Sequence, residues 1–190
     1  MGTKGEQART RILECAQSLF SSKGYCAVTM QDISQASGFS RGGLYRHFAS
    51  TEEIFLEIIR REQANAAASL ERALAEKVRP DRILKVFLRS RMGALSRPSH
   101  SFDVAISEFA ANSEKGREAL AKRAEDSVHI LTRLIVSGNE TGAFSCSTPE
   151  ITATHIMWLL EGLSRHAGLI CVTEFQLEAQ IEQIERLLQK

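Results

Sequence analysis

The sequence predicts an all-α protein in which three short helices precede a bundle of longer ones. Apolar residues recur at spacings of three and four along nearly all of the 190 residues, as they do on one face of an α-helix. N-cap residues and glycine or proline breaks separate these runs. No stretch shows the alternation typical of a strand, and no segment repeats. We therefore expect two parts, residues 1–50 and 51–190, with a long linking helix from residue 51.

The first helix is predicted to end just before Gly24, a suitable residue for the position after a helix, with Lys23 in the last turn. Its buried face is expected to comprise Ile12, Leu13, Ala16, Leu19 and Phe20.

The second and third helices are short and joined by a tight turn. Thr29 is a good N-cap, and Asp32 three residues later approximates a capping box. Gly38 ends this helix, and Ser40 caps the next one. Two short helices joined through a glycine-containing turn indicate a helix-turn-helix.

Longer helices are predicted after residue 50. Ser50 and Glu53 form a capping box that opens the linking helix. Pro80 starts another helix, because proline is tolerated in a first turn, and Pro98 breaks it. An apolar face from Phe102 to Phe109 follows. The next apolar face runs from Leu120 to Ile135, and "SGNETGAFS" breaks its helix. A strongly apolar helix over 149–170 then starts after the cap Thr148. The final helix carries Leu177, Ile181, Ile184 and Leu188.

The charge distribution favours a polyanionic partner for the first part. Residues 1–50 hold six Lys and Arg against three acids, a charge of +3, whereas residues 51–190 hold eighteen against twenty, a charge of −2. A basic segment on a mildly acidic body is typical of a chain that meets nucleic acid.

The composition also indicates where the protein acts. No signal peptide and no run of the ~18 apolar residues needed for a membrane span is present, so we expect a cytoplasmic protein without a membrane partner. The four cysteines show neither CxxC pairing nor metal-ligand spacing, so reduced thiols and no metal or other cofactor are expected.

The stretch "SRGGLYRHF", residues 40–48, combines basic and aromatic side chains with two adjacent glycines. Inside a helix, Gly42 and Gly43 each cost about 1 kcal/mol relative to alanine. The second helix of a helix-turn-helix lies in the major groove of DNA, where small side chains let the backbone approach closely. Both glycines are therefore interpreted as a surface for close approach, while Leu44 and Phe48 hold the helix in the core.

Polar side chains around these glycines can contact DNA. Arg41 can donate two parallel hydrogen bonds to a guanine edge. Tyr45, Arg46 and His47 can bind phosphates, and the N-termini of the helices at Thr29 and Ser40 also favour a phosphate. N-capping alone also explains Thr29 and Ser40.

Residues 12–59 closely resemble the DNA-binding domain of tetracycline-repressor-like (TetR family) regulators. The resemblance rests on Phe20, Gly24-Tyr25, Thr29, Ile33, Ala36, Gly38-Phe39-Ser40 and Leu44-Tyr45-Arg46-His47-Phe48, followed by the acidic start of a long helix. It implies a homodimer that binds a near-palindromic double-stranded DNA operator. It further implies repression that is relieved when a small-molecule effector enters a pocket in the C-terminal bundle. The rest of the chain resembles the family only in length and helix count.

The chain departs from the family pattern just after the third helix. Family members often carry lysine where this chain has Ala49 or Thr51, and many carry a larger residue where it has Gly43. Base recognition is then expected to depend on Arg41 and on Gln31 of the preceding helix. The expected DNA-binding residues are Thr29, Gln31, Ser40, Arg41, Gly42, Gly43, Tyr45, Arg46, His47 and Thr51, with Lys4, Arg9 and Arg11 as a basic arm or first turn.

The C-terminal part offers a seam and a pocket. The 4-3-4 spacing of the last helix is typical of helix–helix packing, either within the chain or between two subunits of a four-helix bundle. The expected dimer interface is Ile156, Leu160, Leu163, Leu177, Ile181, Ile184 and Leu188. The expected pocket residues, for which a plain core or surface role is the alternative, are Phe87, Met92, Phe109, His129, His155 and Trp158.

Three classes of function are compatible with an all-α chain. An enzyme would need a nucleophile–base pair or a metal cluster, and no such motif occurs in the sequence. A helical scaffold or adaptor would use the helix-turn-helix against protein and would not bind DNA. A ligand-responsive transcriptional repressor accounts for the helix-turn-helix, the charge and the resemblance together.

Overall fold

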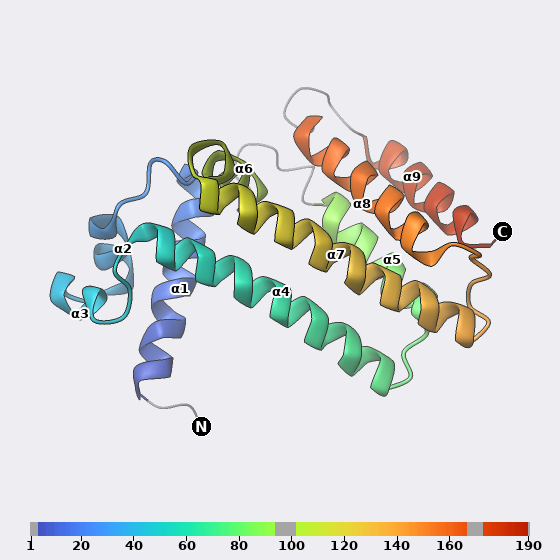
Figure 1. Ribbon diagram of the computed structural model, residues 1–190, viewed down its shortest axis with the longest axis horizontal. Helices are drawn as coiled ribbons and strands as arrows, with labels where there is room; N and C mark the ends of the chain where they lie inside the picture. The colour runs from blue at the N-terminus through green and yellow to red at the C-terminus, as the bar shows by residue number, and fades with distance from the viewer. Residues whose placement is uncertain (1–3, 94–101, 167–172, 190) are drawn as a thin grey trace. The chain divides into compact units, whose positions relative to one another are not determined.

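The computed structural model describes residues 4–93, 102–166 and 173–189, and all the regular secondary structure in this part of the chain is α-helical (Figure 1). Among these residues no helix has the length and apolar character needed to cross a membrane. The helices are α1 (Lys4–Lys23), α2 (Met30–Ser37), α3 (Arg41–Tyr45), α4 (Thr51–Ala75), α5 (Pro80–Gly93), α6 (Phe102–Asn112), α7 (Glu114–Glu140), α8 (Pro149–His166) and α9 (Glu174–Leu187).

The predicted helix boundaries are largely confirmed. Gly24 has a left-handed φ of 81° just after α1, and Pro80 and Pro149 each start a helix. The stretch "SGNETGAFS", residues 137–145, ends α7 as predicted, although the helix continues through its start to Glu140. Gly138 is tolerated there because the Phe144 ring packs against it, and a Cβ would lie 1.9 Å from that ring. The predicted break at Pro98 and the helical residues Ala167 and Ile170 lie outside the described residues.

The chain divides into two compact units, each with its own apolar core. The first comprises residues 1–62 and 100–122, and the second comprises residues 63–99 and 123–190. Helices α4 and α7 contribute residues to both. This division differs from the expected boundary at residue 50, because α6 packs on α1 and adds its apolar face to the first core.

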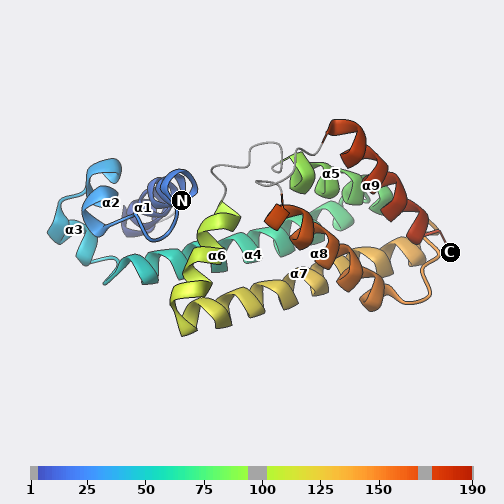
Figure 2. The ribbon, with the colours of Figure 1, turned by 90° about the horizontal axis from the view of Figure 1, so that it is seen from above.

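Aromatic side chains make up the centre of the first unit. The Tyr25 ring lies 4.9 Å from that of Phe55 and 4.6 Å from that of Phe109, and Phe20 meets Phe55 edge to face at 4.7 Å. Such pairs stabilise a core beyond the area they bury. In this unit α1 also packs on α2, and α2 lies beside α3 (Figure 2).

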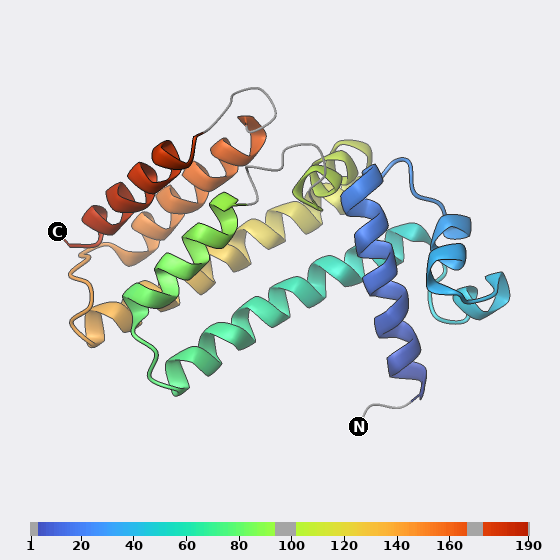
Figure 3. The same ribbon diagram turned by 180° about the vertical axis from the view of Figure 1, so that it is seen from behind.

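The second unit is built from the rest of α4 and α7 with α5, α8 and α9. Helix α9 packs on α5 (Figure 2), and Figure 3 shows the helices of this unit from behind. Thr173 caps α9 in a reciprocal box with Gln176. Cys146 belongs to this core. It, Cys15 and Cys26 form no disulfide among the described residues, and Cys171 lies outside them.

Candidate nucleic-acid interface and apolar cavity

A capping box fixes the start of α2. The Asp32 N–H donates to the Thr29 hydroxyl oxygen at 3.2 Å, and the Thr29 N–H donates to the Asp32 carboxylate at 2.9 Å. The Thr29 hydroxyl donates to the same carboxylate. These bonds from Thr29, with a smaller contribution from Lys23 at 3.2 Å, lower the pKa of Asp32 to about 2. Thr29 therefore acts as the N-cap of α2, with or without a contact to DNA.

The turn between α2 and α3 depends on Gly38. Its φ of 75° is left-handed, a conformation that costs glycine little, and its N–H donates to the Ser34 carbonyl at 3.1 Å. The Ser34 hydroxyl donates to the Phe39 carbonyl at 2.7 Å across the same turn. The angle between the two helices is thus held by side-chain and backbone hydrogen bonds.

Helix α3 is held by one cap and two anchors. The Ser40 hydroxyl oxygen accepts the Gly43 N–H at 3.2 Å. Leu44 is 0% exposed and Phe48 is 1% exposed, so both anchor the segment in the first core. This burial explains how a five-residue helix with two glycines persists.

The two glycines have different environments, which corrects the interpretation of both as a close-approach surface. Gly42 is exposed, and a Cβ there would meet nothing within 4 Å. Gly43 is buried, and its Cβ would lie 3.2 Å from the Ser40 hydroxyl oxygen. Gly43 therefore serves packing and the cap, whereas Gly42 leaves the outer side of α3 bare.

Five of the expected DNA-binding residues are exposed on α2, α3 and the residue that follows them. We call Gln31, Arg41, Gly42, Tyr45 and Arg46 the recognition surface. Tyr45 is 44% exposed, and the Arg41 guanidinium carbon lies 5.8 Å from the centre of its ring. A cation over an aromatic face is partly ordered before any ligand arrives.

The other expected residues divide between surface and interior. Lys4 and Arg11 are exposed on α1, which is helical from Lys4 onward, so they do not form a separate arm. Arg9 is half-buried: it donates to the His47 carbonyl at 2.9 Å and stacks on the Phe48 ring at 4.1 Å. Arg9 therefore positions the segment after α3. Half-buried His47 and Thr51 also face the unit's interior in part.

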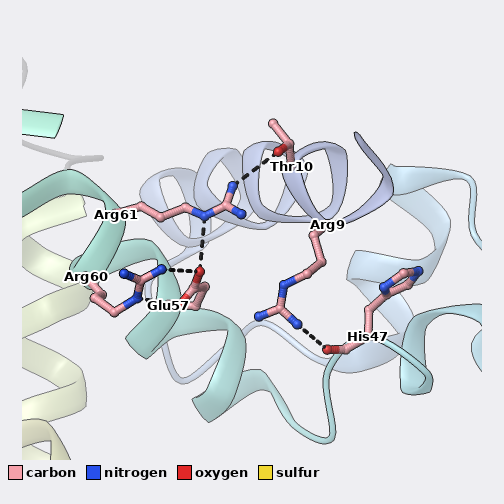
Figure 4. A network of polar contacts seen from close by, with 6 residues as sticks. All are labelled: Arg9, Thr10, His47, Glu57, Arg60 and Arg61. Atoms are coloured by element: carbon pink, nitrogen blue, oxygen red, sulfur yellow. Dashed lines mark hydrogen bonds and ion pairs between the residues drawn. The ribbon is translucent and has the colours of Figure 1, made fainter. Parts of the chain in front are cut away.

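Polar contacts that the sequence did not reveal join α1 to α4 inside the first unit (Figure 4). Arg61 donates to the Thr10 hydroxyl at 3.3 Å and to Glu57 at 3.1 Å. Arg60 also binds Glu57, with two contacts of 2.8 Å. Arg60 first, and Arg61 more weakly, hold the pKa of Glu57 below its ordinary value.

Glu62, the residue after Arg61 in α4, makes a further contact with α1. Gln17 of α1 donates to Glu62 at 2.6 Å. A helical pattern identifies these residues as polar and surface-facing, but it does not pair residues more than 40 positions apart in the chain.

The second unit contains a cavity of about 340 Å³ between α4, α5 and α7, which we call the apolar cavity. Its lining consists of Gln63, Ala66, Ser69 and Leu70 from α4, Ile83, Val86, Phe87 and Ser90 from α5, and Ser127, Ile130, Leu131 and Leu134 from α7. Gln63 donates to the Arg123 carbonyl at 3.1 Å and to the Ser127 hydroxyl at 3.4 Å.

The structure does not bring the six expected pocket residues together. Phe87 lines the apolar cavity, but Met92 is buried in the second core away from it. Phe109 belongs to the core of the first unit. His129 and His155 are exposed, and Trp158 is 68% exposed. These six residues were expected in a pocket because their side chains are large or polar-tipped, but neither feature identifies the helix that lies opposite each one.

The expected dimer interface is also corrected. Its members are buried or half-buried in the core of the second unit, so they pack within the chain: Ile156, Leu160, Leu163, Leu177, Ile181, Ile184 and Leu188. Other apolar side chains of α8 and α9 are exposed instead, namely Ile151 at 57%, Trp158 at 68% and Phe175 at 83%.

Comparison with known proteins agrees with this geometry. Residues 12–58 match the family model described as bacterial regulatory proteins, tetR family. An uncharacterized HTH-type transcriptional regulator of Bacillus subtilis, YfiR, is 30% identical over 166 residues, which cover 85% of this chain and 80% of that protein. The repressor AcnR of Corynebacterium efficiens is 35% identical over 79 residues, 41% of this chain and 42% of AcnR.

Solved structures share the fold along nearly the whole chain. Reduced NemR of Escherichia coli superposes with a TM-score of 0.79 at 20% identity, over 96% of this chain and 98% of NemR. A putative TetR-family regulator from Mesorhizobium loti gives a TM-score of 0.76 at 18% identity, over 98% and 97% of the two chains. The chain is therefore a DNA-binding transcriptional regulator of the TetR family and not an enzyme.

Proposed function

We propose that the protein is a homodimeric repressor in the cytoplasm, which binds a near-palindromic operator and is released from it by a small molecule. The observation that carries this proposal is the recognition surface. Its arginines and tyrosine stay exposed while Leu44 and Phe48 of the same short segment are buried. Such a helix can enter the major groove without unfolding its own support. No observation favours a scaffold that lacks DNA binding.

Each member of the recognition surface has a distinct expected contact. Arg41, in the first turn of α3, is placed to donate to a guanine edge, and Gln31 of α2 can also reach bases. Arg46 and Tyr45 are suited to phosphates, because a guanidinium pairs with phosphate and a phenol donates one hydrogen bond. Lys4 and Arg11 add exposed positive charge on α1.

The dimer is proposed to form through the exposed apolar side chains of α8 and α9. On α8, Ile151, His155 and Trp158 follow helical spacing on one face, and the His155 and Trp158 rings lie 6.2 Å apart. Phe175 lies in the first turn of α9. Exposed tryptophan on an apolar patch is typical of an interface centre.

Sedimentation velocity tests the dimer. Trp158→Asp should give a monomer with weakened operator binding, whereas Ala68→Asp, at an exposed position of α4 outside the patch, should leave the dimer intact. A dimeric Trp158→Asp variant would contradict this choice of interface.

The effector is proposed to enter the apolar cavity and to act through α4. Gln63 lines the cavity, and the two residues before it in the same helix, Arg61 and Glu62, hold α1 through Thr10 and Gln17. A ligand that prefers one position of α4 shifts the balance between two states of the protein. A coupling of about 1–3 kcal/mol would weaken operator binding about 5–150-fold.

Footprinting on DNA that flanks the protein's own gene tests the function as a whole. We expect a protected site with two related half-sites, whose centres are about 34–36 Å apart or a multiple of that distance. Protection should be lost in Arg41→Ala and kept in an exposed control substitution on α6, Ala111→Ser. Equal affinity for all DNA fragments, or none for any, would contradict the proposal.

A further inference from the structure

The lining of the apolar cavity restricts the chemistry of its ligand. Eight of its twelve described residues are apolar, and the other four, one glutamine and three serines, are polar without charge. The hollow is open to solvent on one side, where Val86 is 64% exposed, and its deeper wall includes buried Leu70, Leu131 and Leu134. Moving an unpaired ion against that wall costs several kcal/mol, because no opposite charge there replaces its water. A carboxylate, phosphate or ammonium group therefore has no partner in this lining.

A second hollow in the same unit shows the contrast. This groove of about 650 Å³ lies between α5 and α9, and most of the side chains that line it are charged. Two of its carboxylates already pair with cations, Glu185 with Lys85 at 3.7 Å and Glu182 with Arg186 at 3.4 Å. These pairs stabilise its surface without a ligand, so the groove gives no comparable indication of a ligand class.

Gln63 supplies the polar feature that orients a ligand in the apolar cavity. Its amide nitrogen donates to the α7 backbone and to Ser127, which fixes the side chain on the cavity wall. Within the described residues its amide oxygen accepts no hydrogen bond, so one acceptor stays available at the wall. A site with a fixed acceptor selects a ligand with a matching donor.

We infer that the ligand of this cavity is an uncharged, mainly apolar molecule of two or three fused or linked rings, with one hydrogen-bond donor that Gln63 accepts. The size follows from the volume, which lies near the lower end of the range of about 300–1,000 Å³ for small-molecule sites. This inference rests on the proposed function, since it takes the cavity as the effector site.

A matched pair of fluorescent dyes tests the charge. N-phenyl-1-naphthylamine is uncharged with a single N–H donor, and 1-anilinonaphthalene-8-sulfonate is the same skeleton with a negative charge. In fluorescence titrations of the full chain, the uncharged dye should bind at one site per subunit, at least tenfold more tightly than the sulfonate. Equal or tighter binding of the sulfonate, or no binding of the uncharged dye, overturns the inference.

Two substitutions locate the dye. Ala66 lines the cavity and Ala67, the next residue of α4, does not, although both are exposed. Ala66→Phe should abolish binding of the uncharged dye and Ala67→Phe should not. Unchanged binding to Ala66→Phe overturns the assignment to this cavity.

The role of Gln63 has its own control. Gln63→Leu keeps the apolar volume and removes the acceptor, so affinity for the uncharged dye should fall about 3–10-fold, the effect of one hydrogen bond. The N-methylated dye, which lacks the donor, should bind both proteins equally. If Gln63→Leu weakens both dyes to the same extent, the amide does not select the ligand.

The operator assay separates this inference from the proposed function. Normal operator binding by a protein that prefers the charged dye would reject the ligand class and retain the repressor. Selective binding of the uncharged dye by a protein without operator affinity would retain the ligand class and reject the repressor.

Discussion

Gly42→Leu is the substitution that best separates DNA recognition from folding. The wild-type residue is exposed, and an added Cβ would meet nothing within 4 Å. Leucine is a better helix former than glycine, so α3 should gain up to about 1 kcal/mol. For a chain of 190 residues that corresponds to a melting temperature about 2–4 °C higher.

The same side chain would project from the outer side of α3, where we place the major groove. It would keep the helix backbone away from the bases and lengthen the contacts made by Arg41 and Tyr45. We expect operator affinity to fall at least tenfold, which is about 1.4 kcal/mol. Stability and affinity would thus change in opposite directions, which a folding defect cannot produce.

The neighbouring glycine provides the contrast. A Cβ on buried Gly43 would lie 3.2 Å from the Ser40 hydroxyl oxygen that caps α3. Gly43→Leu should therefore lose part of a cap, worth about 0.5–2 kcal/mol, and add the strain of overpacking, about 1–3 kcal/mol. The two variants should melt on opposite sides of the wild type.

Thermal melts by circular dichroism and fluorescence anisotropy with operator DNA measure both quantities. Ala111→Leu places the same side chain at an exposed position of α6 and should change neither. Wild-type operator affinity in Gly42→Leu would refute close approach at this residue. A lower melting temperature would refute the helix-propensity argument.

Three further predictions concern charge and packing. Asp32→Asn should lower the urea midpoint at pH 7, and this difference should shrink between about pH 4 and pH 2, because a carboxylate with its pKa lowered to about 2 stabilises the fold only while it is ionised. Gly138→Ala should destabilise the second unit by about 1–3 kcal/mol in urea titrations, since its Cβ would lie 1.9 Å from Phe144, and adding Phe144→Leu should restore part of that loss. Arg9→Gln should lower the melting temperature, because it loses the contacts of Arg9 with the segment after α3. Arg11→Gln should leave the melting temperature unchanged and reduce the salt dependence of operator binding. Equal effects of Arg9→Gln and Arg11→Gln on the melting temperature would contradict the assignment of Arg9 to the interior.

The sequence predicted the fold well where local rules decide it. The caps at Thr29 and Ser40, the turn at Gly38 and the helix starts at Pro80 and Pro149 depend on residues a few positions apart, and all are present. Even the approximate capping box of Asp32 is complete.

Long-range packing accounts for the errors. Periodicity identified Phe109 as inward-facing, but only the structure shows that α6 packs in the core of the first unit. The same limit applies to Ile181 and its neighbours on α9, which are buried as the spacing indicates, but against their own chain. Trp158, assigned to a pocket because of its size, is exposed.

The salt dependence of operator binding tests the central claim most directly. Exposed Lys4, Arg11 and Arg46 supply three phosphate-binding cations per subunit, so a dimer should displace about six counterions. In fluorescence anisotropy titrations of the footprinted operator, log K should fall linearly with log salt, with a slope near −5. Arg46→Gln, which removes two of these contacts from the dimer, should reduce the slope by about 2. A slope near zero would contradict DNA binding through Lys4, Arg11 and Arg46.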